Sequence, residues 1–462
     1  MKQEKQLFGH PAGLYILFFT EMWERFSYYG MRALLVLFLV ASVNGANPGY
    51  GWSEADALKL YGIYTFLVYL SSIPGGYIAD KWLGQKKAVM LGGLFLVAGH
   101  GILAIQALWA FYTGIGLIIA GVGFLKPNIS TMVGGLYAPG DDRRDKGFTI
   151  FYIGINVGAF LSALIVGYIG ETYGWHYGFG AAGIGMAIGQ IVFMSGQKYL
   201  TGVGESFKSL ESKGAVKDNP LTKIEKDRII VMLISFLMII VFWAAFEQAG
   251  GLMNLYADQK TDRMIGMIGW EVPATWFQSV NAFFIITLGV PIAAFWYSRK
   301  KSGKESSSIL KMAVGVIIMG WGFLFMSAAS LQYQSAGSSA MYWLVLAYLF
   351  HTIGELCASP VALSYITKLS PLKYSSIMMG VYFAATGLGN YVAGWVGVWS
   401  QSAGELQIFT GIAIFCTVFG GLVILMLKPL KRLAHGAEDF SEETMADFNT
   451  QQIEVDPALK PQ

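Results

Sequence analysis

The sequence predicts an all-α integral membrane protein in which twelve transmembrane helices form two six-helix bundles. Three observations favour this class. Hydrophobic residues make up 55% of the 462 residues and charged residues only 13%, about half the roughly 25% that soluble domains contain. The mean hydropathy is +0.51. The apolar residues also recur in runs of about 20 along almost the whole chain, the length that a helix needs to cross a bilayer.

The first apolar run is predicted to be a retained span. Two lysines precede it, but no small-residue cleavage site follows, and it continues into the charged stretch EMWER. Eleven further runs follow, separated by segments rich in turn residues and charge, such as GANPGYGWSEAD and YAPGDDRRDKG. The predicted helices cover residues 13–41, 56–79, 86–106, 110–132, 147–169, 177–197, 229–251, 273–297, 308–330, 340–366, 374–398 and 406–428.

The longest polar connection follows the sixth run and divides the chain. Its composition is typical of a solvated linker, and the C-terminal residues are polar and acidic. We therefore expect an N-terminal six-helix bundle over 1–197, a cytoplasmic linker over 198–228, a C-terminal six-helix bundle over 229–430 and a polar cytoplasmic tail over 431–462.

The distribution of Lys and Arg orients the predicted helices. An even number of spans puts both termini on one side of the membrane. Of the 32 basic residues, 26 lie in the termini and the alternate loops on that side, whereas the opposite loops carry only Lys59, Lys260 and Arg263. The positive-inside rule then predicts cytoplasmic termini and a multi-pass protein of the inner (plasma) membrane. The net charge of +3 and the lack of a basic block argue against nucleic acid as a partner.

Seven charged residues remain inside the predicted spans. They fall on spans one, four, seven and ten: Glu21, Glu24, Arg25, Arg32, Lys126, Glu247 and Glu355. Unpaired at a helix centre, they would cost on the order of 20 kcal/mol together, so they must face one another or a wet cavity. The simplest arrangement pairs Arg32 with Glu247 and Lys126 with Glu355 between the bundles. These pairs would act as gates.

The same count of charges predicts proton coupling. Four carboxylates oppose three cations, so one acid has no partner and is free to change its protonation as its neighbours move. Glu21 and Arg25 are four residues apart and share a helical face. No CxxC, HExxH or Ser-His-Asp set is present, and an enzyme is not expected.

The stretch EMWERFSYYG, beginning at Glu21, has the pattern ExxERFxYYG. It resembles the signature of the bacterial proton-dependent oligopeptide transporters (POT/PTR), a branch of the major facilitator superfamily. Further similar motifs are GGYIADKWLGQKKAV, GFLKPNIS, FTIFYIGINVGAF, FWAAFEQ, WFQSVNAFF and GELCASPVALSYITKL. The resemblance extends from Phe8 to about Lys428. It implies the major facilitator fold and proton-coupled symport of di- and tripeptides by alternating access, with peptide-like drugs as further candidate substrates.

The resemblance also implies roles for individual residues. Glu21, Glu24 and Arg25 would couple protons, so the coupling ion is H⁺ and no cofactor is expected. Arg32 and Glu247 would form one gate, and Lys126 and Glu355 the other. The implied substrate-binding residues are Arg25, Tyr29, Arg32, Tyr64, Tyr69, Lys126, Asn156, Asn281, Glu355 and Tyr382. Arg25 and Lys126 would meet the peptide carboxylate and Glu355 its ammonium. We expect the protein to function in the lipid bilayer as a monomer.

Three departures from the family pattern are visible. No apolar run in residues 198–228 is long enough to add helices between the bundles. Phe246 stands where some relatives carry a second acid beside the one at Glu247, and Tyr382 stands where some relatives have Trp. Two alternatives remain open at this point: a carrier of another small anion or zwitterion, and a membrane receptor that binds peptide without moving it. His351 lies one helical turn before Glu355 and is a further candidate for proton transfer.

Overall fold

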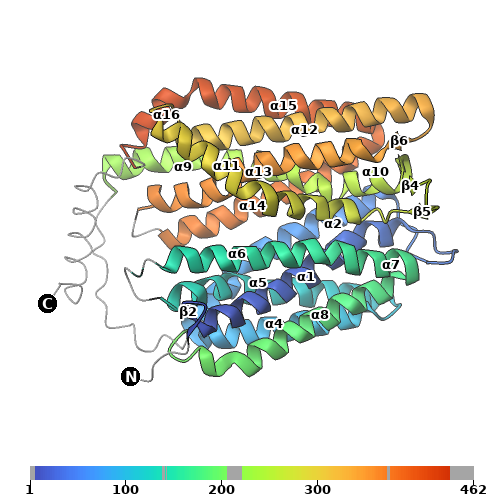
Figure 1. The fold of residues 1–462 in the computed structure, drawn as a ribbon, viewed down its shortest axis with the longest axis horizontal. Helices are drawn as coiled ribbons and strands as arrows, with labels where there is room; N and C mark the ends of the chain where they lie inside the picture. The colour runs from blue at the N-terminus through green and yellow to red at the C-terminus, as the bar shows by residue number, and fades with distance from the viewer. Residues whose placement is uncertain (1–5, 138–140, 142, 205–220, 372–374, 438–462) are drawn as a thin grey trace.

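The computed structural model of the chain describes residues 6–137, 141, 143–204, 221–371 and 375–437. Long helices run side by side in two groups (Figure 1), formed by an N-terminal half (residues 6–204) and a C-terminal half (residues 221–437). The first and last described residues lie at the same end of the bundle, on the left in Figure 1. This end is called the terminal face below, and the other end the opposite face.

In the N-terminal half, helices cover each of the first six predicted spans. The elements are β1 (Gln6–Leu7), β2 (His10–Pro11), α1 (Ala12–Val40), α2 (Glu54–Leu70), α3 (Ser72–Ile78), the π-helix η1 (Ala79–Leu83), α4 (Gln85–Leu103), α5 (Leu108–Gly135), α6 (Arg143–Ser162), the π-helix η2 (Ala163–Gly167), α7 (Tyr168–Tyr173), α8 (Trp175–Gly196) and the 3₁₀ turn η3 (Gln197–Tyr199).

In the C-terminal half, helices cover the remaining six predicted spans. The elements are α9 (Lys223–Phe246), the 3₁₀ turn η5 (Glu247–Ala249), α10 (Leu252–Lys260), β3 (Thr261–Asp262), β4 (Met264–Ile265), β5 (Trp270–Glu271), α11 (Trp276–Lys301), α12 (Ser308–Ala336), β6 (Ser339–Ala340), α13 (Met341–Leu369), α14 (Ser375–Ala403), α15 (Glu405–Leu425) and α16 (Leu427–Leu433). Strands β4 and β5 form a short antiparallel hairpin between α10 and α11.

Several spans are less regular than the apolar pattern predicts. The second is broken at Ser71, whose hydroxyl donates to the carbonyls of Val68 and Ile119 at 2.9 and 2.8 Å. The fifth continues through η2 and α7 and ends before Gly174, which has a φ of 137° that suits glycine. Most of the predicted linker and the predicted tail from residue 438 lie outside the described residues. The bundle and linker boundaries therefore stay predictions.

Nine helical stretches of the described chain are long and apolar enough to cross a membrane. The other three predicted spans correspond to α1, which carries four charged residues, to the interrupted α2–α3 pair and to α14, and their crossing stays a prediction. Large apolar side chains also point outward, among them Ile184 and Ile191 on α8 and Phe415 and Leu422 on α15. These exposed faces suit a lipid environment.

The two halves meet closely along α2 and α14. A Cβ atom added to Gly394 would lie 2.8 Å from the Cα of Gly62. Helix α6 packs against α11 at a second junction between the halves. Small residues let helix backbones approach in this way, and van der Waals packing then holds the helices together without a hydrophobic driving force from water.

Gly394→Val is therefore expected to destabilise the protein by about 1–3 kcal/mol, because the neighbouring backbone cannot move aside as a flexible side chain can. The measurement is thermal unfolding of the purified protein in detergent. Gly411→Val on α15 is the matched control, since a Cβ there meets no atom within 4 Å. Equal unfolding temperatures for the two variants would contradict the close contact.

Candidate functional site

A cavity of about 1040 Å³ lies between the two halves. Helices α1, α2, α3, α5 and α6 line it from one side, and α9, α11, α13 and α14 from the other. The predicted site residues that line it are Glu21, Arg25, Tyr29, Arg32, Tyr69, Lys126, Asn156, Glu247, Asn281, Glu355 and Tyr382. The volume and the convergence of a few polar groups on apolar walls are typical of a small-molecule site.

The cavity opens toward the terminal face. Its lining extends to Tyr77 and Asp80 near the end of α3, and both residues are exposed. Toward the opposite face, hydrogen bonds join the halves: Asn254 Nδ2 donates to the carbonyl of Ala33 at 2.8 Å, and Ser279 Oγ to that of Phe160 at 2.8 Å. The structure is thus open at one end and closed at the other.

Two acids share one arginine on α1. Arg25 Nε lies 2.7 Å from Glu21 Oε1 and 3.0 Å from Glu24 Oε2, and all three side chains are buried. Glu21 and Arg25 line the cavity, whereas Glu24 lies outside its lining. Neither oxygen of Glu24 accepts a hydrogen bond within the part of the chain that the structure describes. Glu21 and Arg25 share a helical face, as their spacing predicted, and Glu24 also lies within ion-pair distance of the same arginine.

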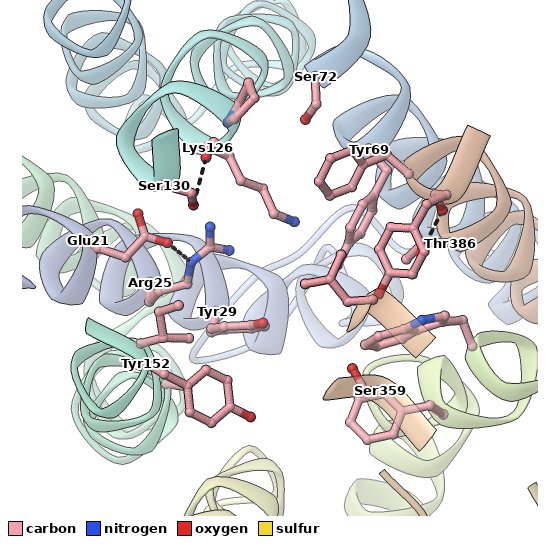
Figure 2. A pocket seen from close by; sticks show the side chains of 18 of the residues that line it. Glu21, Arg25, Tyr29, Tyr69, Ser72, Lys126, Ser130, Tyr152, Ser359 and Thr386 are labelled. Atoms are coloured by element: carbon pink, nitrogen blue, oxygen red, sulfur yellow. Dashed lines mark hydrogen bonds and ion pairs between the residues drawn. The ribbon is translucent and has the colours of Figure 1, made fainter. Parts of the chain in front are cut away.

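Lys126 extends from α5 into the cavity between Arg25 and Tyr69 (Figure 2). Its Nζ lies 3.7 Å from the centre of the Tyr69 ring, close enough for a cation–π interaction. The ammonium group therefore rests against the aromatic face of Tyr69. Pro127 directly follows this lysine in α5.

Glu355 lies on the other wall of the cavity, on α13. Its Oε2 accepts a hydrogen bond from Asn281 Nδ2 at 2.8 Å, and the same amide group is 2.9 Å from Thr352 Oγ1. Lys126 and Glu355, both within the described chain, do not form the ion pair that we expected. The physical reason is the open cavity, which separates the two walls toward the terminal face and leaves each group with a partner from its own half.

The other expected pair is formed. Arg32 Nη1 lies 3.0 and 3.1 Å from the two carboxylate oxygens of Glu247, across the junction between the halves. Tyr61 adds a hydrogen bond from its hydroxyl to Glu247 Oε2 at 2.7 Å, and the Tyr29 ring lies 4.7 Å from the Arg32 guanidinium. These contacts seal the closed end of the cavity.

The structure differs from expectation at two other residues. Tyr64 does not line the cavity; it is buried with its ring 6.4 Å from that of Tyr28. His351 is buried and also lies outside the lining, with its ring 4.5 Å from that of Phe323 within the C-terminal half. Although His351 lies one helical turn before Glu355 on α13, its imidazole packs against Phe323 of α12 and not into the cavity. Asn156, in contrast, lines the cavity and donates to the carbonyl of Tyr152 at 2.9 Å.

Sequence reasoning missed several lining residues. Aromatic and small polar side chains complete the walls, namely Tyr152, Trp243, Phe246, Gln278, Ser359 and Thr386, and Figure 2 shows Tyr152, Ser359 and Thr386 around the cavity. Tyr61 was also missed as a partner of Glu247. These residue types are common in all twelve predicted spans, and only their helical faces, which the sequence alone leaves open, distinguish them.

Two membrane-embedded halves around a charged central cavity define a membrane transporter rather than an enzyme. A sequence model described as "POT family" matches residues 86–216 and 215–403. The chain belongs to the POT family, as the motifs on α1 and the later helices predicted, and it has the major facilitator fold of that family.

Relatives of known name agree with this assignment. The chain is 34% identical to Peptide transporter YePEPT of Yersinia enterocolitica, over 94% of this chain and 97% of the relative. It is 32% identical to a di-/tripeptide transporter of Lactococcus lactis, over 94% of this chain and 98% of that relative. A crystal structure of a peptide transporter POT in complex with sulfate superposes with a TM-score of 0.85 at 34% identity, over 93% of this chain and 97% of that chain.

Proposed function

We propose that this protein is a symporter that carries di- and tripeptides into the cell together with protons, by alternating access. One observation carries the proposal: the cavity has Arg25 and Lys126 on one wall and Glu355 on the other, without an ion pair between Lys126 and Glu355. A short peptide is a zwitterion, so its carboxylate suits the first wall and its ammonium suits the second. The peptide would replace the missing pair.

Peptide length would be read by the separation of these charges. An extended residue spans roughly 3.5 Å, so a dipeptide reaches about 7 Å and a tripeptide about 10 Å. The side chains would meet mostly apolar walls, including Trp243 and Tyr382, and side-chain preference would be broad. Asn281, which already donates to Glu355, would orient that carboxylate toward the ammonium group.

Proton coupling would arise from the shared arginine. The single positive charge of Arg25 is shared between two carboxylates, those of Glu21 and Glu24. When a peptide carboxylate takes up the guanidinium, one of these acids loses its partner in a buried site, and protonation then removes its charge. The proton would leave when the guanidinium returns after peptide release. H⁺ is the only coupling ion that this scheme needs.

Peptide binding would also drive the change of conformation. Opposite charges at the two peptide ends attract both walls and draw the halves together at the terminal face. The Arg32–Glu247 pair at the other end would then open, because both ends cannot close in rigid-body rocking. The cavity lies within one chain, which supports function as a monomer. The excess of Lys and Arg at the terminal face supports a cytoplasmic location for that face, with the protein in the inner membrane.

Uptake into liposomes is the direct test. Purified protein with a labelled dipeptide outside and an inward proton gradient is expected to accumulate the label. A protonophore should then release the accumulated label down to the external concentration. Uptake that continues unchanged without the gradient would overturn proton coupling, and the absence of any peptide uptake would overturn peptide transport itself.

A further inference from the structure

A second set of contacts closes the cavity at the opposite face, around Glu171 at the end of α7. Its Oε2 accepts a hydrogen bond from the backbone N–H of Ala274 at 2.8 Å, and its Oε1 accepts from the N–H and the hydroxyl of Thr275 at 2.9 and 2.6 Å. Ala274 and Thr275 lie directly before α11, so these three bonds join the two halves. They are independent of Arg32 and Glu247.

A cation completes this contact set, which we name the Glu171 clasp (Glu171, Arg263, Ala274 and Thr275). Arg263 Nη1, at the base of the β4–β5 hairpin, lies 3.8 Å from Glu171 Oε2, and the arginine is held in place by ion pairs to Asp258 at 3.2 Å and Glu271 at 2.9 Å. The Arg263 side chain is only 10% exposed. A largely dry environment strengthens these charged hydrogen bonds.

The backbones pack tightly beside the clasp. A Cβ atom on Gly167 would lie 2.0 Å from Thr275 Oγ1, so the η2 segment has no room for a side chain there. Two further hydrogen bonds continue the same seam: Trp276 Nε1 donates to the carbonyl of Leu164 at 3.0 Å, and Ser279 Oγ to that of Phe160 at 2.8 Å. The Glu171 clasp is the outermost and the only charged part of this series of hydrogen bonds between α6–α7 and α11.

We infer that Glu171 is a gating residue, which holds the cavity closed at the opposite face and must release Ala274, Thr275 and Arg263 each time that face opens. This inference rests on the alternating access of the proposed function. Opening separates α7 from the start of α11, because the seam runs along the junction between the halves. The carboxylate then exchanges three hydrogen bonds for contacts with water. Glu171 therefore sets the ratio of molecules closed and open at the opposite face.

Glu171→Gln tests the inference, because it keeps the size of the side chain but removes its charge and one acceptor. We expect the ratio of open to closed molecules at the opposite face to rise about tenfold or more, since hydrogen bonds to a charged group are stronger than neutral ones. Spin labels at Tyr177→Cys on α8 and Ser335→Cys on α12, both exposed positions, report the distance between the halves. The buried Cys357 and Cys416 are replaced by alanine.

The distances are measured in liposomes without peptide, so this readout does not depend on transport. Glu405→Gln is the matched control, because its ion pair with Lys260 lies at the same face but within the C-terminal half. If Glu171→Gln does not fold, Arg263→Gln replaces it, with a shift in the same direction. A distance distribution equal to that of the control overturns the inference. Uptake by the unlabelled wild-type protein is measured in parallel, and its absence overturns the proposed function alone.

Discussion

Lys126→Ala is expected to abolish gradient-driven accumulation of dipeptides. The ammonium group of Lys126 lies 3.7 Å from the centre of the Tyr69 ring, and it has no carboxylate partner within ion-pair distance in the described chain. A peptide carboxylate would supply that partner. Loss of one member of a buried charge pair costs about 2–4 kcal/mol, equal to roughly 30-fold to 700-fold weaker binding.

Binding and uptake are both measured, with a matched lysine as the control. Lys59→Ala should transport normally, because Lys59 is exposed on α2 and does not line the cavity. A peptide with an amidated C-terminus separates the charge effect from general damage: the wild type should prefer the free acid strongly, and Lys126→Ala should lose most of this preference. An unchanged preference would contradict the role of Lys126 in carboxylate binding.

The opposite wall provides the complementary comparison within the same experiment. Glu355→Ala should reduce discrimination against peptides with a blocked N-terminus, and it should leave the preference for a free C-terminus intact. Asn281 would lose its acceptor at 2.8 Å but keep Thr352 Oγ1 at 2.9 Å, so the local structure retains one of its bonds. Two variants with opposite patterns of selectivity would assign one end of the peptide to each wall.

Composition and periodicity predicted the helices well because the bilayer imposes a strong and simple constraint. Apolar runs of about 20 residues have few alternatives in a membrane. Irregular backbone carries a weaker signal: Pro74, which has no N–H for the carbonyl of Leu70, follows the break at Ser71, and the Ser71 hydroxyl bonds to Ile119, which is far away in sequence. The fifth span likewise continues to Tyr173, beyond the end that its apolar run predicted.

The charges were partly predictable for a related reason. A buried ion such as Arg32 requires a partner of opposite charge. Pairing opposite charges between the two halves predicted Glu247 on the seventh span as that partner. Lys126 and Glu355 show the limit of this reasoning, because the two members of a gate would be paired only in the conformations in which that gate is closed. The number of charges does not specify which conformation is observed.

Glu171 was missed for a different reason. The sequence places it in GETYGW, between the fifth and sixth predicted spans, where an acid needs no explanation. Its contacts with Ala274 and Thr275 arise from tertiary packing of α7 against the start of α11. An acid at the end of a span is a gate only if the other half supplies donors, and only the folded structure brings those donors to it.

Glu24→Gln is expected to uncouple transport from the proton gradient. Both oxygens of Glu24 lack a hydrogen-bond donor in the described chain, and its single ionic contact is Arg25, which Glu21 shares. If Arg25 moved away, Glu24 would therefore be the acid left with the fewest partners. Protonation would then stabilise Glu24 more than Glu21, because it removes an unpaired buried charge. Glutamine keeps the shape but has no titratable group.

The size of the effect follows from the driving force. One proton that moves inward at 100 mV supplies about 2.3 kcal/mol, enough for a roughly 50-fold concentration ratio of a neutral peptide. In Glu24→Gln this ratio should fall to about one, while exchange of labelled for unlabelled peptide across the membrane continues, because exchange needs no net proton movement. Glu405→Gln should keep both activities, because the carboxylate of Glu405 pairs with Lys260 and neither residue lines the cavity. If Glu24→Gln accumulates peptide at the wild-type ratio, the proton-binding role belongs to Glu21 or Glu355. If the variant loses both exchange and accumulation, Glu24 supports the binding site itself through Arg25.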